Sequence, residues 1–204
     1  MNKRRASQGN RCLRCKINKN LCFCDALKMQ KTNTKVSIIM HHRERYLTSN
    51  TANLATLMIE NCQIHMRGLK DEPFSVDQLK IADDEVALFL FPHEEAKELN
   101  ADFIQSLGDK KVHLVVPDGS WSQAVKFYRR EEGLSDIQCV SLPPGKPGKY
   151  RLRKTSDSNR LSTYEAIARA LEILEKDSAL GNQLDQAFDT MVNRIIRSRT
   201  AFDN

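Results

Sequence analysis

Apolar runs and helically spaced apolar residues alternate along this chain from residue 36 onward. Short continuous apolar runs predict buried strands at 36–40, 86–91, 112–116 and 137–142, with another short strand at 63–66. Helical spacing predicts helices at 50–60, 94–107, 120–131, 162–176 and 182–198. Residues 143–148 hold three prolines and two glycines, so they cannot form regular structure. The alternation predicts an α/β fold with a mainly parallel sheet covered by helices on both faces.

A polar loop follows the predicted strand at 112–116 and leads directly into the next helix. It contains Asp118, Gly119, Ser120 and the only tryptophan, Trp121. Such loops lie at the carboxyl ends of strands, where α/β sheets bind their ligands, and the amides of the next helix face the same crevice. Asp118 is therefore a candidate catalytic residue. The structural alternative is that Asp118 caps the helix, Gly119 makes the turn and Trp121 fills the core.

Four of the six cysteines lie close together near the N-terminus, with the spacing Cys12-X2-Cys15-X6-Cys22-X-Cys24. Four thiolates suit tetrahedral zinc, and a small loop-rich segment needs such a staple in order to fold. Disulfides are the alternative, but they are rare in cytosolic proteins. We predict a structural zinc knuckle within residues 1–30, ahead of a catalytic domain at 31–204. Cys62 and Cys139 lie in apolar surroundings and are predicted to be core residues.

The formal charge of +6 and the pI of about 9.0 come largely from two basic blocks. The first precedes Asp25 and holds Lys3, Arg4, Arg5, Arg11, Arg14, Lys16 and Lys19; the second surrounds Asp157 and holds Lys146, Lys149, Arg151, Arg153, Lys154 and Arg160. Clusters of this kind bind phosphate backbones without regard to sequence. The pattern favours a nucleic-acid partner over an ordinary solvated surface.

The length of 204 residues suits one domain with a small appendage. No apolar run approaches the roughly 18 residues of a membrane span. Residues 1–5 are basic with no apolar segment behind them, so they do not resemble a secretory signal. We expect a cytoplasmic protein that has no membrane partner.

Four ordered motifs resemble those of one family, the DTW-domain proteins. Asp118 to Trp121, followed by Gln123-Ala124, resembles the family signature Asp-X-Thr-Trp, with Ser120 in place of Thr. The remaining motifs are His41-His42-Arg43-Glu44-Arg45 with Ser49-Asn50-Thr51-Ala52, then Leu90-Phe91-Pro92, and Arg160-Leu161-Ser162-Thr163-Tyr164-Glu165-Ala166. His42 stands in place of Pro, Ser49 in place of Thr and Ala52 in place of Gly. With the cysteines, the resemblance covers the chain from Cys12 to about Leu171.

The resemblance implies a SPOUT-like fold, with the C-terminal part of the sheet tied into a trefoil knot around the cofactor. It also implies an enzyme that transfers the 3-amino-3-carboxypropyl group of S-adenosylmethionine to N3 of a tRNA uridine, in the variable loop at position 47, and releases methylthioadenosine. Asp118 would take the N3 proton, helped by a pKa that partial burial against Trp121 raises.

The resemblance also implies which other residues form the site. The candidates for cofactor binding are Ser49, Asn50, Thr51, Pro92, Gly119, Ser120, Trp121 and Leu142; the candidates for RNA binding are Arg43, Arg45, Arg151 and Arg153. Trp121 either packs the loop, which we consider the simpler expectation, or stacks on a flipped uracil. Two other functions stay open, a SPOUT-type RNA methyltransferase and a non-catalytic zinc-dependent RNA-binding protein.

Overall fold

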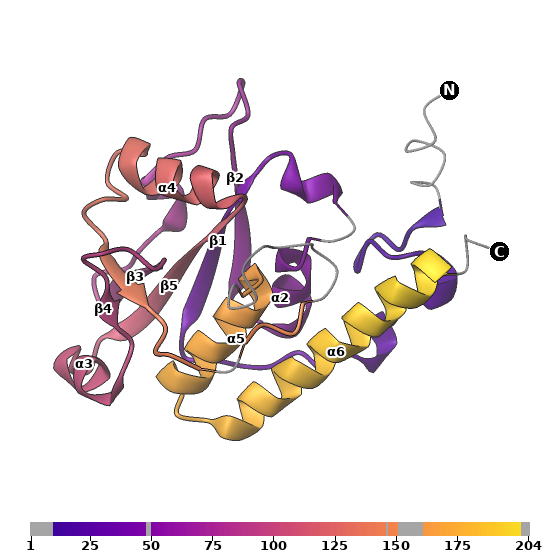
Figure 1. The fold of residues 1–204 in the computed structure, drawn as a ribbon. Helices are drawn as coiled ribbons and strands as arrows, with labels where there is room; N and C mark the ends of the chain where they lie inside the picture. The colour runs from indigo at the N-terminus through magenta and orange to yellow at the C-terminus, as the bar shows by residue number, and fades with distance from the viewer. Residues whose placement is uncertain (1–9, 48–49, 146, 151–160, 201–204) are drawn as a thin grey trace.

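A six-stranded, all-parallel sheet forms the centre of the molecule in this computed structural model, which describes residues 10–47, 50–145, 147–150 and 161–200 (Figure 1). The strand order is β2-β1-β5-β3-β6-β4. The strands are β1 (Lys35–His41), β2 (Cys62–Arg67), β3 (Glu85–Leu90), β4 (Lys97–Glu98), β5 (Lys111–Asp118) and β6 (Gln138–Ser141). The predicted parallel sheet is confirmed.

Helices cover both faces of this sheet. They are α2 (Ala52–Met58), α3 (Ala101–Ser106), α4 (Trp121–Arg130), α5 (Thr163–Leu174) and α6 (Ser178–Thr200), with short 3-10 turns η2 (Lys19–Leu21), η3 (Cys24–Ala26), η4 (Glu44–Tyr46) and η5 (Val76–Leu79). Helices α2, α5 and α6 pack on one face, and α4 packs on the other. No helix in the described ranges is both long and apolar enough to cross a membrane.

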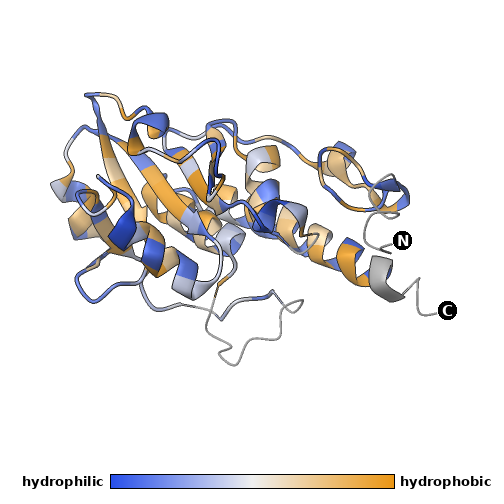
Figure 2. Cartoon of the chain, turned by 90° about the horizontal axis from the view of Figure 1, so that it is seen from above, coloured by the Kyte–Doolittle hydropathy of each residue, from blue (hydrophilic) through white to orange (hydrophobic). Residues whose placement is uncertain are grey.

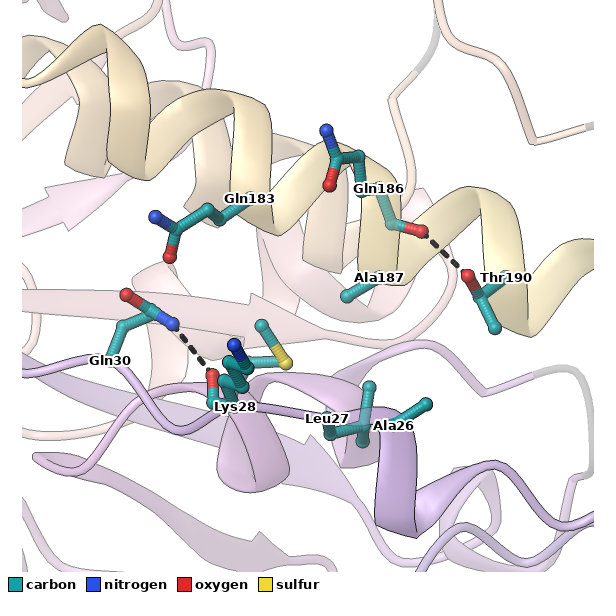
Figure 3. A pocket seen from close by; sticks show the side chains of 9 residues that line it. Ala26, Leu27, Lys28, Gln30, Gln183, Gln186, Ala187 and Thr190 are labelled. Atoms are coloured by element: carbon teal, nitrogen blue, oxygen red, sulfur yellow. Dashed lines mark hydrogen bonds between the residues drawn. The ribbon is translucent and has the colours of Figure 1, made fainter.

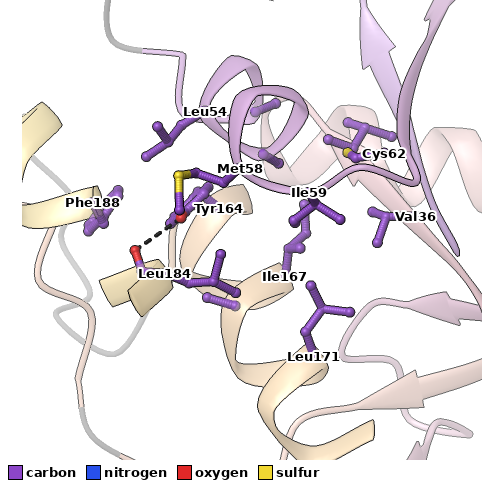
Figure 4. Close-up of a cluster of buried hydrophobic side chains, with 14 of the residues drawn as sticks. Val36, Leu54, Met58, Ile59, Cys62, Tyr164, Ile167, Leu171, Leu184 and Phe188 are labelled. Carbon is purple, nitrogen blue, oxygen red and sulfur yellow. Dashed lines mark hydrogen bonds between the residues drawn. The ribbon is translucent and has the colours of Figure 1, made fainter. Parts of the chain in front are cut away.

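The larger core lies between the sheet and helices α2, α5 and α6 (Figure 4). Tyr164 and Phe188 stack at its centre, with ring centroids 5.4 Å apart, and the Tyr164 hydroxyl donates a 3.0 Å hydrogen bond to the Leu184 carbonyl. Figure 2 shows the same pattern by hydropathy, because the strands in the middle of the sheet are mostly hydrophobic. Cys62 and Cys139 are buried, as predicted.

The predicted helix at 94–107 is wrong in its first half. Residues 97–98 form the edge strand β4, and the buried Leu99 extends this pairing through its N–H to the Ser141 carbonyl at 2.8 Å. The helix begins only after Asn100, whose side chain caps it by accepting from the Phe103 N–H. Burial of Leu99 beside β6 therefore overrides the helical spacing.

A chain of four buried or half-buried polar side chains crosses four strands on the α4 face. His113 is fully buried; its Nε2 lies 2.8 Å from the Ser37 hydroxyl and its Nδ1 lies 3.2 Å from a Glu85 carboxylate oxygen. The Ser37 hydroxyl also lies 3.1 Å from Nε2 of His65. Burial and the neighbouring charge of Lys35 lower the pKa of His113. Neutral imidazoles satisfy every member of this chain, since Nδ1–H donates to Glu85 and Nε2 accepts from Ser37.

Candidate functional site

Asp118 lies at the carboxyl end of β5 and is almost entirely buried, with 2% of its surface exposed. One carboxylate oxygen accepts a 2.6 Å hydrogen bond from the side-chain amide of Asn50, and the other accepts a 2.6 Å hydrogen bond from the hydroxyl of Thr163. Both donors stabilise the ionised carboxylate, whereas burial opposes it. Three segments that are distant in sequence therefore meet at one acid.

The connections of the sheet explain why they meet here. Strand β1 continues through α2 on one face of the sheet, whereas β5, its neighbour, continues through α4 on the other face. Chains that leave adjacent parallel strands toward opposite faces open a crevice at the carboxyl edge, the usual ligand site of open α/β sheets. Asp118 pairs in register with Met40 of β1, so it lies at this crevice.

Asn50 has both ends of its side chain fixed. Its Oδ1 accepts from the Ala52 N–H at 3.0 Å, as a helix-capping side chain does, and its amide nitrogen donates to Asp118. Asn50, which precedes the N-cap residue Thr51, thus anchors the first turn of α2 and also contacts the candidate acid. The neighbouring Thr51 is also buried, and its hydroxyl accepts from the Tyr164 N–H at 3.3 Å. These bonds join the start of α2 to the start of α5.

The start of α5 is held by a capping box. The Ser162 hydroxyl accepts from the Glu165 N–H, and the Glu165 carboxylate accepts from the Ser162 N–H at 2.9 Å. The same buried carboxylate accepts from the backbone N–H of Lys149. This motif therefore caps α5, and Glu165 additionally holds Lys149 beside the helix.

The start of α4 is capped by Ser120, not by Asp118. The Ser120 hydroxyl accepts from the Gln123 N–H at 3.4 Å, and the Gln123 side chain accepts from the Ser120 N–H at 2.6 Å. A Cβ on Gly119 would lie 2.8 Å from the Gln123 oxygen, so a larger residue there would displace the capping side chain. The capping alternative for Asp118 is wrong, because Ser120, two residues further on, performs that task.

Trp121 does not fill the core. The indole is 46% exposed, although it packs against the buried Phe91 with ring centroids 4.8 Å apart. As the first residue of α4, Trp121 lies at the rim of the sheet, and its ring extends over the end of β3. Pro92 follows Phe91 and is exposed, and Leu142 is partly buried against the larger core.

His41, the last residue of β1, and His42, which follows it, are both half-buried. Their rings stack, with centroids 4.6 Å apart, and the His41 ring lies parallel to that of Phe127 in α4. Burial lowers the pKa of His41. Packing on α4 places His41 on the face of the sheet opposite to the Asp118 side chain.

The four cysteines near the N-terminus form one cluster, in which all Sγ atoms lie within 4.8 Å of one another. The pairs Cys12–Cys24 and Cys15–Cys22 each lie 3.8 Å apart, far beyond a disulfide bond. Tetrahedral zinc with Zn–S bonds of about 2.3 Å requires S–S separations of about 3.8 Å. Burial raises the pKa of Cys15 and Cys24, so a bound cation is needed for all four to be thiolates. The donor set and its dimensions fit zinc.

Residues 9–196 match the DTW domain. The chain belongs to the DTW domain family. Similar proteins carry the name tRNA-uridine aminocarboxypropyltransferase 2: one from Mus musculus is 28% identical over 85% of this chain and 59% of its own length, and one from Drosophila melanogaster is 26% identical over 89% and 73%. A Macaca fascicularis protein of the same name is 27% identical over 85% and 59%. This DTW domain thus spans less than two thirds of the mouse and macaque relatives, and no solved structure matches it.

The predicted basic residues of the DTW domain differ in exposure and pairing. Arg43 and Arg45 are exposed between β1 and Asn50. Lys149, in contrast, pairs with Asp185 at 3.0 Å, so α6 neutralises part of its charge. The remaining predicted residues Ser49, Arg151 and Arg153 lie outside the described residues, as do Lys3, Arg4, Arg5, Lys146, Lys154 and Arg160.

A cavity of about 370 Å³ lies away from Asp118, between the segment after the cysteines and α6 (Figure 3). Its polar lining includes Gln30, Gln183 and Thr190, and its apolar floor includes Met58. None of the predicted site residues contributes to it. The cavity marks where the N-terminal segment meets α6, which lie side by side in Figures 1 and 2.

Sequence reasoning did not select Thr163 or Glu165 as site residues of the DTW domain. Both belong to the Ser162–Ala166 motif, but its pattern is that of an ordinary capping box. The signal in the sequence that could have identified Thr163 is its position next to the capping residue Ser162, because the cap leaves the Thr163 hydroxyl available for another contact. Only the packing of α5 against β5 brings that hydroxyl to Asp118.

Proposed function

We propose that this DTW domain is a tRNA-uridine aminocarboxypropyltransferase that uses S-adenosylmethionine and forms 3-(3-amino-3-carboxypropyl)uridine in the variable loop. The observation that carries the proposal is the convergence of Asn50, Asp118 and Thr163 at the switch point of the sheet. Each comes from a different family motif. The names of the three relatives support the reaction class.

The proposed reaction forms one bond and breaks one. Uridine N3 attacks the methylene carbon beside the sulfonium, the carbon–sulfur bond breaks, and its electron pair returns to sulfur to give neutral methylthioadenosine. The N3 proton must leave, because protonated N3 is a poor nucleophile. In this proposal the Asp118 carboxylate accepts it. Asn50 and Thr163 each donate to a different oxygen of this carboxylate.

Asn50 and Thr163 would act by orienting this carboxylate. Since each donates to a different oxygen, together they fix the plane of the carboxyl group. A base held in one orientation loses little entropy when the substrate arrives. Because Asp118 is buried, the uridine must enter the crevice between β1 and β5 in order to contact its carboxylate.

We propose that the cofactor occupies the same crevice, bounded by Asn50, Thr51, Gly119 and Ser120, with Ser49, Pro92 and Leu142 completing its wall. The capping box pairs the amides of Ser120 and Gln123 within the protein, so the amide of Ser122 is the better candidate for the cofactor's carboxylate. A trefoil knot of the SPOUT type around this site belongs to the same proposal.

We further propose that the cysteine cluster holds one structural zinc ion. All four ligands would be thiolates, which leaves no open coordination position for catalysis. The basic residues beside it, among them Arg11, Arg14 and Lys19, would contact tRNA phosphates, as would Arg43, Arg45, Arg151 and Arg153. The proposed location is cytoplasmic.

The test is incubation of the purified protein with S-adenosylmethionine and unmodified tRNA, followed by mass spectrometry of nucleosides and small molecules. Aminocarboxypropyl-uridine with methylthioadenosine supports the proposal. A methylated base with adenosylhomocysteine would make the protein a methyltransferase of related fold. Binding of tRNA without any product would leave an RNA-binding protein.

A further inference from the structure

In the part of the chain that the structure describes, the exposed aromatic rings lie at one edge of the sheet. Within the described residues only Tyr46 and Trp121 expose their rings, at 58% and 46%. Tyr46 ends the turn η4 that follows β1, and Trp121 begins the helix that follows β5. Those two strands flank the crevice at Asp118. Single exposed apolar residues are ordinary, but two aromatic rings on either side of the same crevice form a pattern.

The Trp121 ring is supported from the protein side. Phe91, only 5% exposed, packs against it at 4.8 Å between centroids with a 42° tilt. An indole that is backed by a buried ring loses little further freedom when a flat ligand stacks on its exposed part. Such a surface suits stacking by a nucleobase.

Tyr46 carries a different support. The guanidinium of Arg45 lies over its ring, 4.6 Å from the centroid, and both side chains are exposed. The turn is also tied to the crevice by its backbone, because Leu47 N–H donates to Glu44 and Asn50 N–H donates to Leu47, each at 3.0 Å. Asn50 in turn donates to Asp118, so the position of Tyr46 is coupled to the site.

The proposed chemistry requires an unpaired base. N3 is the Watson–Crick donor of uridine, so a paired uridine hides the atom that reacts, and the target must leave its stack to reach a buried acid. Unstacked bases are held in proteins by aromatic side chains and arginine planes. The two exposed rings supply that chemistry at the crevice.

We propose that Tyr46 and Trp121 form an aromatic rim that stacks on unpaired bases of the RNA on either side of Asp118. This inference rests on the proposed function for its ligand. The rim makes the protein select a single-stranded stretch around its target, while phosphate contacts add affinity without regard to pairing.

The experiment measures binding of unmodified tRNA without S-adenosylmethionine over a salt series, for Tyr46→Ala, Trp121→Ala, Tyr46→Phe and Trp121→Phe. Ile81→Ala is the matched control, because Ile81 is also exposed but lies at the opposite, amino edge of the sheet. Its neighbour Lys80 accepts a hydrogen bond there, through its carbonyl, from the Lys35 side chain at the start of β1. Thermal melts verify that every variant is folded.

We expect each alanine variant to bind tRNA about 5- to 150-fold more weakly, whereas the phenylalanine variants retain most of the affinity. The salt slope should stay at the wild-type value in the alanine variants and fall by about one in Arg45→Ala. Binding to a fully paired RNA duplex should be unchanged in the alanine variants.

The aromatic rim is refuted if the alanine variants bind tRNA as tightly as Ile81→Ala does. It is also refuted if their affinity for the paired duplex falls as much as their affinity for tRNA. The outcome is separable from that of the reaction. If the wild-type protein forms no product but the alanine variants bind tRNA more weakly, the aromatic rim is retained and the transferase function is rejected. If the variants form product fully and bind tRNA like the wild type, the transferase function is retained and the aromatic rim is rejected.

Discussion

Replacing Asp118 by Asn removes the negative charge of the carboxylate but keeps its size and shape. The new side-chain oxygen can accept from Asn50, and the new NH₂ can donate to the Thr163 hydroxyl, which is able to accept. Both hydrogen bonds survive in neutral form. Charge-assisted bonds are about 1 kcal/mol stronger than neutral ones, so Asp118→Asn should lower the free energy of unfolding by about 1–2 kcal/mol.

Replacing Asp118 by Ala has a different effect on stability. It removes both acceptors and leaves a buried amide on Asn50 and a half-buried hydroxyl on Thr163 without them. An unsatisfied buried polar group costs about 1–3 kcal/mol, so the loss should be about 2–4 kcal/mol. A domain of ordinary stability, about 5–15 kcal/mol, still folds.

The two variants therefore separate catalysis from structure. If Asp118 takes the N3 proton, both should lose turnover by a factor of about 10² to 10⁴. Urea unfolding gives the stability, and single-turnover formation of methylthioadenosine gives the rate. Wild-type turnover in Asp118→Asn would refute the role as a base. Equal destabilisation of the two variants would refute the hydrogen-bond exchange.

Three further results are expected. Cys24→Ser should abolish the binding of one zinc ion per chain, measured by elemental mass spectrometry, and lower the melting temperature, because Cys24 belongs to the larger core. The free energy of unfolding should fall as the pH drops below 6.5, the ordinary pKa of histidine, because burial lowers the pKa of His113 in the folded protein and the unfolded chain therefore binds more protons. Urea titrations from pH 8 to 5.5 should show this fall, and it should be smaller in His113→Gln. Glu165→Gln should cost about 1–3 kcal/mol in urea unfolding, since one amide oxygen cannot serve both Lys149 and Ser162. Ser162→Ala loses the bonds of its hydroxyl to Glu165 but keeps the contact between Glu165 and Lys149, so it should cost about 1 kcal/mol, and equal losses would contradict the double contact.

Most of the elements were predictable because their patterns are local. The strand at 112–116 is a continuous apolar run, and the helices after Ser120 and Ser162 begin with serine caps. The error at 94–107 arose because Leu99 fits a helical spacing equally well, and only its burial beside β6 selects the strand. Local pattern cannot decide between two periods over so few residues.

The candidate site was predictable in part. Asp118 was found from its place after a buried strand, and Asn50 from its motif. The exposure of Trp121 was predicted wrongly, because a lone tryptophan next to a core strand is more often buried. The position of its ring depends on its packing against Phe91, which follows β3 and is distant in sequence.

The sequence by itself therefore determined the alternation of strands and helices, the cysteine cluster and the acid at the end of β5, because each is encoded by neighbouring residues. The tertiary structure alone decided that Asn50, Thr163 and Asp118 form one hydrogen-bonded unit and that the exposed rings of Tyr46 and Trp121 flank it. The physical reason is that strand order and the faces chosen by α2, α4 and α5 are set by burial of the whole sheet. No local segment carries that information.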